Sequence, residues 1–83
     1  MTKHSATKTF QVVSTAINEV LNESGRERLA EIVTDTRLRI DLDLDSLDLA
    51  VLTVKLEAKT GVDVFAKGIV STVGEILSRI NER

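Results

Sequence analysis

The sequence predicts an all-α fold: a small antiparallel four-helix bundle with three main helices, a short third helix, and a long loop between helices one and two. Apolar residues recur at helical spacing in three separate stretches, each bounded by residues that start or stop helices. One further stretch has a period of two, but no second strand is available to pair with it, and a lone strand leaves backbone groups unpaired. Amphipathic helices of this kind bury their apolar faces against one another.

Length and composition limit the classes of function that this chain can have. An 83-residue chain makes one domain at most, so we expect residues 1–83 to form a single domain, with residues 1–7 loosely ordered. A net charge of −2, with two Phe and no Trp or Tyr, gives no surface for nucleic acid. With no cysteine and a single histidine, His4, neither a metal centre nor a nucleophilic catalytic pair is predicted. The chain shows no membrane span and no signal peptide, so we expect it to be soluble and cytoplasmic. We also expect it to be a monomer.

The first helix is predicted from an apolar stripe that begins shortly after the polar N-terminus. Thr7 or Thr9 is its candidate N-cap, and Gly25 suits a left-handed turn at its end. Residues 26–33 continue helical character for a turn or two. The stripe consists of Phe10, Val13, Ile17, Val20 and Leu21.

The next segment alternates apolar and charged residues. The apolar members are Leu38, Ile40, Leu42 and Leu44, and the charged ones are Arg39, Asp41, Asp43 and Asp45. We interpret it as an extended loop that places alternate leucines in a helical core. A calcium-binding EF-hand loop beginning at Asp41 is rejected, because Ser46 stands where glycine is needed and Leu52 where a bidentate Glu is needed. Weak cation association with these acids stays open, and they form no predicted acid/base pair.

The second helix is predicted to run from Ser46 to Thr60 and to stop at Gly61. Asp45 or Ser46 caps it, and Asp48 follows Asp45 at the spacing of a capping box, worth about 1 kcal/mol. Ser46 therefore has two interpretations. It is either a helix cap or a serine whose hydroxyl carries a phosphate group, since a helix N-terminus favours anions.

This helix is apolar around more than half of its circumference. Leu49, Leu52 and Leu56 are expected in the core. A neighbouring apolar face either is buried as well or docks a partner. That face consists of Leu47, Ala50, Val51 and Val54.

The last part of the chain predicts a short segment and a closing helix. Residues 66–70 are expected to form one irregular helical turn around Gly68. Ser71 or Thr72 caps the closing helix, and Glu75 fits a capping box with Thr72. Its inward stripe consists of Val73, Ile76, Leu77 and Ile80.

In several of these motifs the chain resembles an acyl carrier protein, from the first helix to Ile80. The order of the motifs along the chain, with Asp-Ser-Leu at the start of the second helix, is the specific part of the resemblance. The matching residues are Thr36-Arg37-Leu38, Leu42-Asp43-Leu44-Asp45-Ser46-Leu47-Asp48, Leu52, Leu56-Glu57 and Ser71-Thr72-Val73-Gly74-Glu75.

The resemblance implies a carrier with no catalytic activity of its own. A phosphopantetheine arm from coenzyme A would be esterified to Ser46, between Asp45 and Leu47, and would hold acyl groups as thioesters. Its implied partners are a phosphopantetheinyl transferase, whose metal-dependent recognition Asp45 assists, and acyl-transferring or acyl-modifying enzymes. The apolar face at Leu47, Ala50, Val51 and Val54 would be the docking surface. A core pocket lined by Leu52, Leu56, Val64 and Ile76 would admit part of an acyl chain or be packed shut.

Three departures from the family pattern indicate a specialised carrier rather than the general fatty-acid one. Asp43 stands where the family usually has Gly, Val51 takes a usual Glu position, and Lys55 and Lys59 dilute the acidic charge. We therefore expect docking to be more apolar and less sensitive to salt, in fatty-acid, polyketide or related biosynthesis. The alternatives are an aminoacyl or peptidyl carrier and a non-covalent helical interaction module, which would not need the hydroxyl of Ser46.

Overall fold

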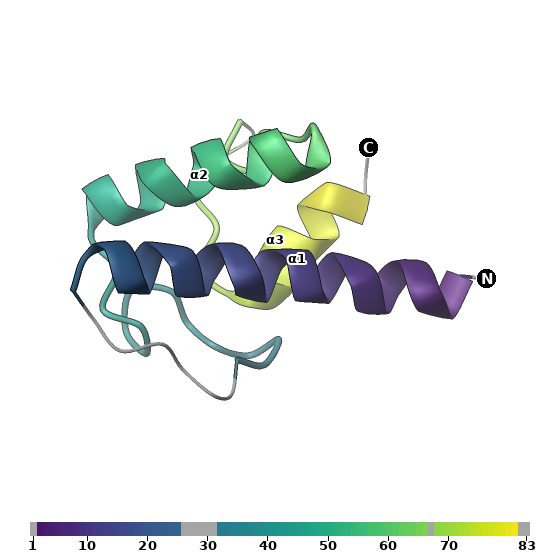
Figure 1. Cartoon of the computed structure of the whole chain (residues 1–83), viewed down its shortest axis with the longest axis horizontal. Helices are drawn as coiled ribbons and strands as arrows, with labels where there is room; N and C mark the ends of the chain where they lie inside the picture. Colours follow the sequence, from purple (N-terminus) through teal and green to yellow (C-terminus); the bar gives the residue numbers. More distant parts are fainter. Residues whose placement is uncertain (1, 26–31, 67, 82–83) are drawn as a thin grey trace.

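The computed structural model describes residues 2–25, 32–66 and 68–81, with the backbone alone for residues 2–7. In these ranges it contains three helices, α1 (Thr2–Glu23), α2 (Ser46–Thr60) and α3 (Val73–Asn81), and no strand. The predicted all-α class is confirmed. In Figure 1, α1 and α2 run side by side in opposite directions, and α3 lies against α1. None of the helices in these ranges combines the length and the apolar character needed to cross a membrane.

The predicted short third helix is wrong for the residues described between α2 and α3. Two successive turns replace it: the N–H of Ala66 donates to Asp63 O at 3.2 Å, and the N–H of Gly68 donates to Phe65 O at 3.1 Å. Gly68 has φ +132°, far outside the helical region, so the turns do not propagate into a helix. The described fold therefore has three helices, where the sequence predicted four.

Helix α1 is longer than the sequence predicted. It begins at Thr2, so the expected start at Thr7 or Thr9 is wrong, and residues 2–7, expected to be loosely ordered, lie in the helix. No Gly or Pro interrupts this stretch, and nothing in its backbone chemistry stops the helix from extending. At the other end Gly25 has φ +82°, which confirms the predicted left-handed turn.

The chain between α1 and α2 is described only in part. Residues 26–31 lie outside the described residues, so the helical turns expected there and the long loop as a whole stay predictions. Ile32 and Val33 are not helical. From residue 32 to residue 45 the chain contains turns and one isolated bridge, between Arg37 and Thr72.

The alternating segment contributes three of its four apolar side chains to the core. Leu38, Leu42 and Leu44 are buried, which confirms the predicted burial of the leucines, whereas Ile40 is 71% exposed. The cause is a turn in which the N–H of Asp41 donates to Arg37 O at 2.9 Å, which replaces the extended backbone that strict alternation requires.

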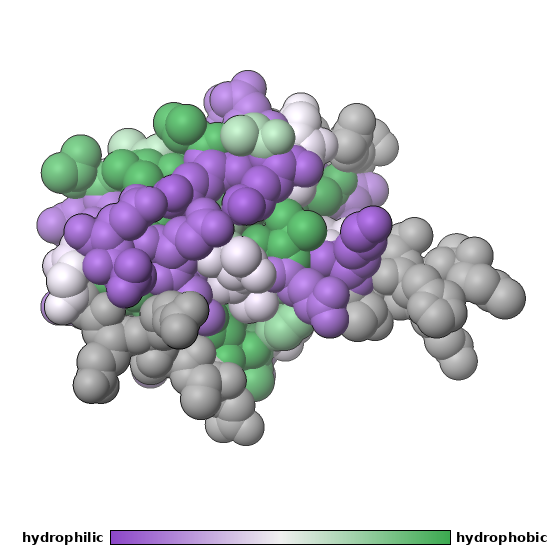
Figure 2. Space-filling model, viewed as in Figure 1, coloured by the Kyte–Doolittle hydropathy of each residue, from purple (hydrophilic) through white to green (hydrophobic). Residues whose placement is uncertain are grey.

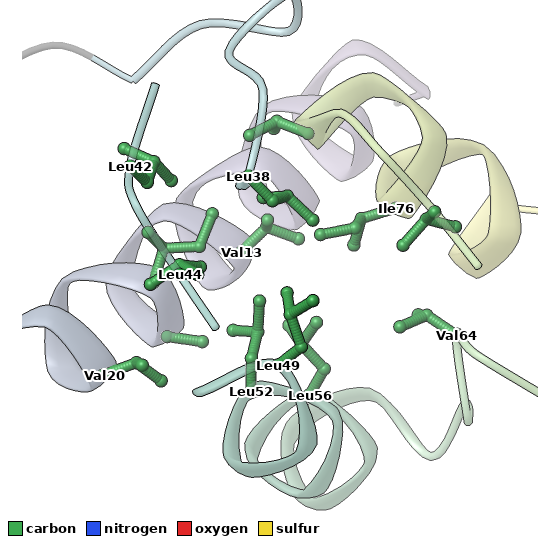
Figure 3. Close-up of a cluster of buried hydrophobic side chains, with 14 of the residues drawn as sticks. Val13, Val20, Leu38, Leu42, Leu44, Leu49, Leu52, Leu56, Val64 and Ile76 are labelled. Atoms are coloured by element: carbon green, nitrogen blue, oxygen red, sulfur yellow. The ribbon is translucent and has the colours of Figure 1, made fainter. Parts of the chain in front are cut away.

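The core lies where the three helices and this segment meet. Figure 3 shows Val13 of α1, Leu38 of the connecting segment, Leu52 and Leu56 of α2 and Ile76 of α3 converging on one interior. All five are fully buried. Burying one Leu or Ile side chain stabilises a fold by about 1.5–3 kcal/mol, so this interior fixes the position of α2 and of its N-terminus.

Two lysines tie α2 to α1. Lys55 Nζ lies 3.0 Å from Glu23 Oε2 and 3.4 Å from Glu19 Oε1, and Lys59 Nζ lies 3.7 Å from Glu19 Oε2. The hydrogen bond to Glu23 is the main cause that raises the pKa of Lys55, with a smaller contribution from Glu19. The positive charges of α2 are therefore directed toward α1.

Candidate functional site

Asp45 is the N-cap of α2. Its extended backbone (φ −96°, ψ −175°) precedes the helix, and its Oδ1 accepts the N–H of Asp48 at 2.9 Å. In return, Asp48 Oδ2 accepts the N–H of Asp45 at 3.1 Å. The predicted capping box is confirmed, and Asp45 rather than Ser46 is the cap.

Ser46 is the first residue of α2 and is exposed. Because Asp45 makes the capping bonds, the Ser46 hydroxyl is not needed for the helix, and Oγ has no hydrogen-bond partner among the described residues. The N-terminus of a 15-residue helix also places unpaired N–H groups and partial positive charge beside it. A serine so placed fits a phosphate ester, because the hydroxyl is accessible and the helix end favours an anion.

The backbone just before the cap contains a left-handed residue. Asp43 has φ +57° and is the one non-glycine residue with positive φ in the described parts of the chain. This is the position at which the resemblance places Gly. Asp tolerates the left-handed region better than most residues, at a cost of about 1 kcal/mol. The left-handed conformation at Asp43 lets Leu44 point into the core while Asp45 and Ser46 face solvent.

The neighbouring acid Asp41 has a structural partner, Arg37. Asp41 Oδ2 accepts the backbone N–H of Arg37 at 2.8 Å, and Asp41 Oδ1 accepts from Arg37 Nη2 at 3.1 Å. The side-chain hydrogen bond with Arg37 is the main cause that lowers the pKa of Asp41. Within the described residues no three Asp, Glu or His side chains are grouped so that they could hold a metal ion.

The second apolar face of α2 is largely on the surface. Leu47 is 73% exposed and Val54 66%, Ala50 is exposed, and only Val51 packs partly against the core. Ala50, Val51 and Val54 line a surface hollow together with Lys55. Figure 2 shows apolar residues along the edge of the molecule formed by α2. The fold therefore does not bury both apolar faces of this helix.

The four side chains that were expected to line a core pocket pack closely around one interior. Leu52, Leu56, Val64 and Ile76 all have 0% exposure, and Figure 3 shows them around one common interior. A group that enters this interior has to push these side chains apart.

The capping box that the sequence predicted at the start of α3 is present. Thr72 Oγ1 accepts the N–H of Glu75 at 3.2 Å, while Glu75 Oε1 accepts the N–H groups of Thr72, at 3.1 Å, and of Ser71. The backbone bond from Ser71, followed by that from Thr72, lowers the pKa of Glu75.

Two supporting contacts were not predicted from the sequence. Gly74 donates its N–H to Thr34 O at 2.8 Å, and a Cβ on Gly74 would lie only 3.2 Å from that oxygen. Arg79 Nη1 donates to Val64 O at 3.0 Å and so ties α3 to the turn after α2. The only sequence signal for the contact of Gly74 with Thr34 was a single Gly shortly after a helix cap. The contact of Arg79 with Val64 had no sequence signal.

Comparison with known families agrees with this geometry. The family model described as a phosphopantetheine attachment site matches residues 11–80, which is most of the chain. The chain therefore belongs to the phosphopantetheine attachment site family, whose members carry a covalently attached phosphopantetheine prosthetic group. No curated protein and no solved structure matches it significantly.

Proposed function

We propose that this protein is an acyl carrier protein that carries phosphopantetheine on Ser46. The observation that supports this most directly is the exposed Ser46 hydroxyl at the N-terminus of α2, left free because Asp45 performs the capping. When bound, the phosphopantetheine group supplies a terminal thiol that holds acyl groups as thioesters. The chain itself contains no cysteine, so such a thiol has to come from the prosthetic group.

The residues around Ser46 have separate roles in this proposal. Ser46 Oγ forms the ester bond to the phosphate, and the N–H groups at the start of α2 stabilise its charge. Asp45 fixes the helix start and faces the phosphopantetheinyl transferase, and Leu47 lies exposed beside the attachment point. The protein presents its cargo to separate acyl-transferring or acyl-modifying enzymes and has no catalytic residue of its own.

The docking surface we propose is the exposed apolar face of α2. It consists of Leu47, Ala50, Val51 and Val54. Lys55 and Lys59 are paired with Glu19 and Glu23 of α1, so they add little charge to this surface. A partner therefore meets mainly apolar side chains, which is our reason to propose a specialised carrier in fatty-acid, polyketide or related biosynthesis. We further propose a single domain over residues 1–83 that acts as a monomer in the cytoplasm.

The first experiment measures the intact mass after incubation with coenzyme A and a broad-specificity phosphopantetheinyl transferase. Wild type is expected to gain one phosphopantetheine, and Ser46→Ala none. The matched control is Ser71→Ala, which removes another exposed serine next to a helix start and should load like wild type. Circular dichroism checks that each variant is folded.

The exposed face of α2 also favours a second candidate, a non-covalent helical interaction module. A folded wild-type protein that gains no mass would support that module and contradict the carrier role. A loaded protein whose thiol accepts amino acids rather than acyl groups from activating enzymes would be an aminoacyl or peptidyl carrier instead.

A further inference from the structure

A second surface hollow lies away from α2, where two segments distant in the sequence meet. One segment precedes α2 and the other precedes α3. No residue of α2 contributes to it, so it is separate from Ser46 and from the apolar docking face. The hollow is lined by Arg37, Arg39, Ile40, Ile69, Val70 and Ser71.

Backbone hydrogen bonds hold the two walls of this hollow together. The N–H of Leu38 donates to Ser71 O at 2.8 Å, and the N–H of Val73 donates to Thr36 O at 3.0 Å. Beneath the walls, the side chains of Leu38 and Val70 are buried in the core. The hollow is thus a preformed part of the fold, and a ligand would meet it with little reorganisation.

The rim of the hollow is apolar. Ile69 is 81% exposed, the most exposed of the large apolar side chains in the described parts of the chain, and Ile40 is 71% exposed. Single exposed apolar residues are ordinary, but these two flank one hollow that is bordered by polar groups, as is typical of interaction sites. The turn that leaves Ile40 exposed therefore adds an apolar side chain to the rim of this hollow.

The charge of the hollow is opposite to that of the chain as a whole. Among the residues that the structure describes, two arginines and no acidic residue line it, whereas the net charge of the protein is −2. The guanidinium of Arg37 is paired with Asp41 at 3.1 Å. Arg39 is exposed and forms no ion pair with any residue that the structure describes, so its charge is available to a ligand.

We propose that this hollow is a second interaction surface, which binds a protein segment presenting an apolar side chain next to a carboxylate. The apolar side chain packs between Ile40 and Ile69, and the carboxylate pairs with Arg39. A bare hydrocarbon chain would use the two isoleucines but would leave the positive charge unmatched. A partner could occupy this surface while the face of α2 is engaged elsewhere, since the two share no residue.

The test begins with a random peptide library displayed on phage. Binders are selected on the wild-type protein and depleted on the double variant Arg39→Glu/Ile69→Ser. Enriched sequences are expected to combine Asp or Glu with Leu, Ile or Phe. A basic consensus, or no enrichment over the depleted pool, overturns the proposal.

The best enriched peptide is then synthesised and its affinity measured for single variants. Ile69→Ser and Arg39→Glu are each expected to weaken binding by about tenfold or more. The matched controls are Val33→Ser, which removes another exposed apolar side chain, and Lys8→Glu, which reverses another exposed charge. Both should bind like wild type, as should Ser46→Ala, so the result does not depend on phosphopantetheine.

Backbone amide NMR spectra of the protein identify what occupies the hollow. With the peptide, the expected shifts are centred on Ile40, Ile69 and Ser71. If the same amides shift with protein concentration alone, the surface joins two copies of this chain and the proposal is wrong. It is equally wrong if decanoate displaces the peptide completely from the same amides, because the ligand is then a small apolar acid.

Discussion

At the scale of single residues, Asp43 is the position where the backbone before Ser46 is strained. Its φ of +57° costs a non-glycine residue about 1 kcal/mol, and a β-branched residue more. We expect Asp43→Val to lower the free energy of unfolding by about 1–2 kcal/mol. Asp43→Gly should stay within about 1 kcal/mol of wild type, because relief of strain is offset by the greater freedom of Gly in the unfolded chain.

Urea denaturation of the three proteins measures this difference. The matched control is Asp35→Val, at another exposed aspartate whose φ is not positive, and it should change the free energy of unfolding by less than about 0.5 kcal/mol. Equal destabilisation by the two Val substitutions would show that loss of an aspartate, and not backbone strain, is responsible.

At the scale of elements, the N-terminus of α3 gives the fold a pH dependence. Bonds from the N–H groups of Ser71 and Thr72 hold the pKa of Glu75 below its ordinary value of 4.5. The stability from the ionised carboxylate is therefore complete above that value and is lost as pH falls through the lower pKa of the folded state. Glu75→Gln, whose amide oxygen still accepts hydrogen bonds, should unfold with a weaker dependence on pH between about 5 and 2.

The comparison with Thr72→Ala separates the effect of the Glu75 charge on stability from the effect of the capping hydrogen bond. Loss of the Thr72 side chain removes a neutral hydrogen bond at the N-cap, so it should cost about 1 kcal/mol at every pH. Thermal unfolding followed by circular dichroism over this pH range measures both variants. A wild-type curve parallel to that of Glu75→Gln would mean that Glu75 contributes nothing to the acid sensitivity.

At the scale of the whole molecule, local chemistry was predictable from the sequence and long-range geometry was not. The capping boxes of Asp45 with Asp48 and of Thr72 with Glu75 were predicted, because the two partners of each box lie three residues apart. The exposure of Ile40 was not predicted, because a turn replaces the expected extended backbone. The short third helix was predicted but does not form, because Gly68 adopts a positive φ. The pairing of Lys55 with Glu19 and Glu23 had no sequence signal, since it depends on how two distant helices pack.

The charge distribution of the whole molecule also predicts how it meets its partners. Long-range steering requires a strong field, but the net charge is −2 and the lysines of α2 are paired with α1. Raising salt from about 0.1 M to about 1 M shortens the Debye length from about 10 Å to about 3 Å. We expect kcat/KM for phosphopantetheine loading by the transferase to fall less than about tenfold over this range, because the docking face is mainly apolar.

Val51→Glu is the variant that tests this explanation. It places a carboxylate on the half-buried edge of the docking face, beside Leu47 and Val54. With a basic partner surface it should make loading faster at low salt and more dependent on salt than in wild type. Ser78→Glu adds the same charge on α3, away from α2, and controls for net charge. If both variants change the salt dependence equally, the field of the whole molecule governs docking. If wild-type loading itself collapses steeply with salt, recognition depends on charge and the apolar face is not its main determinant.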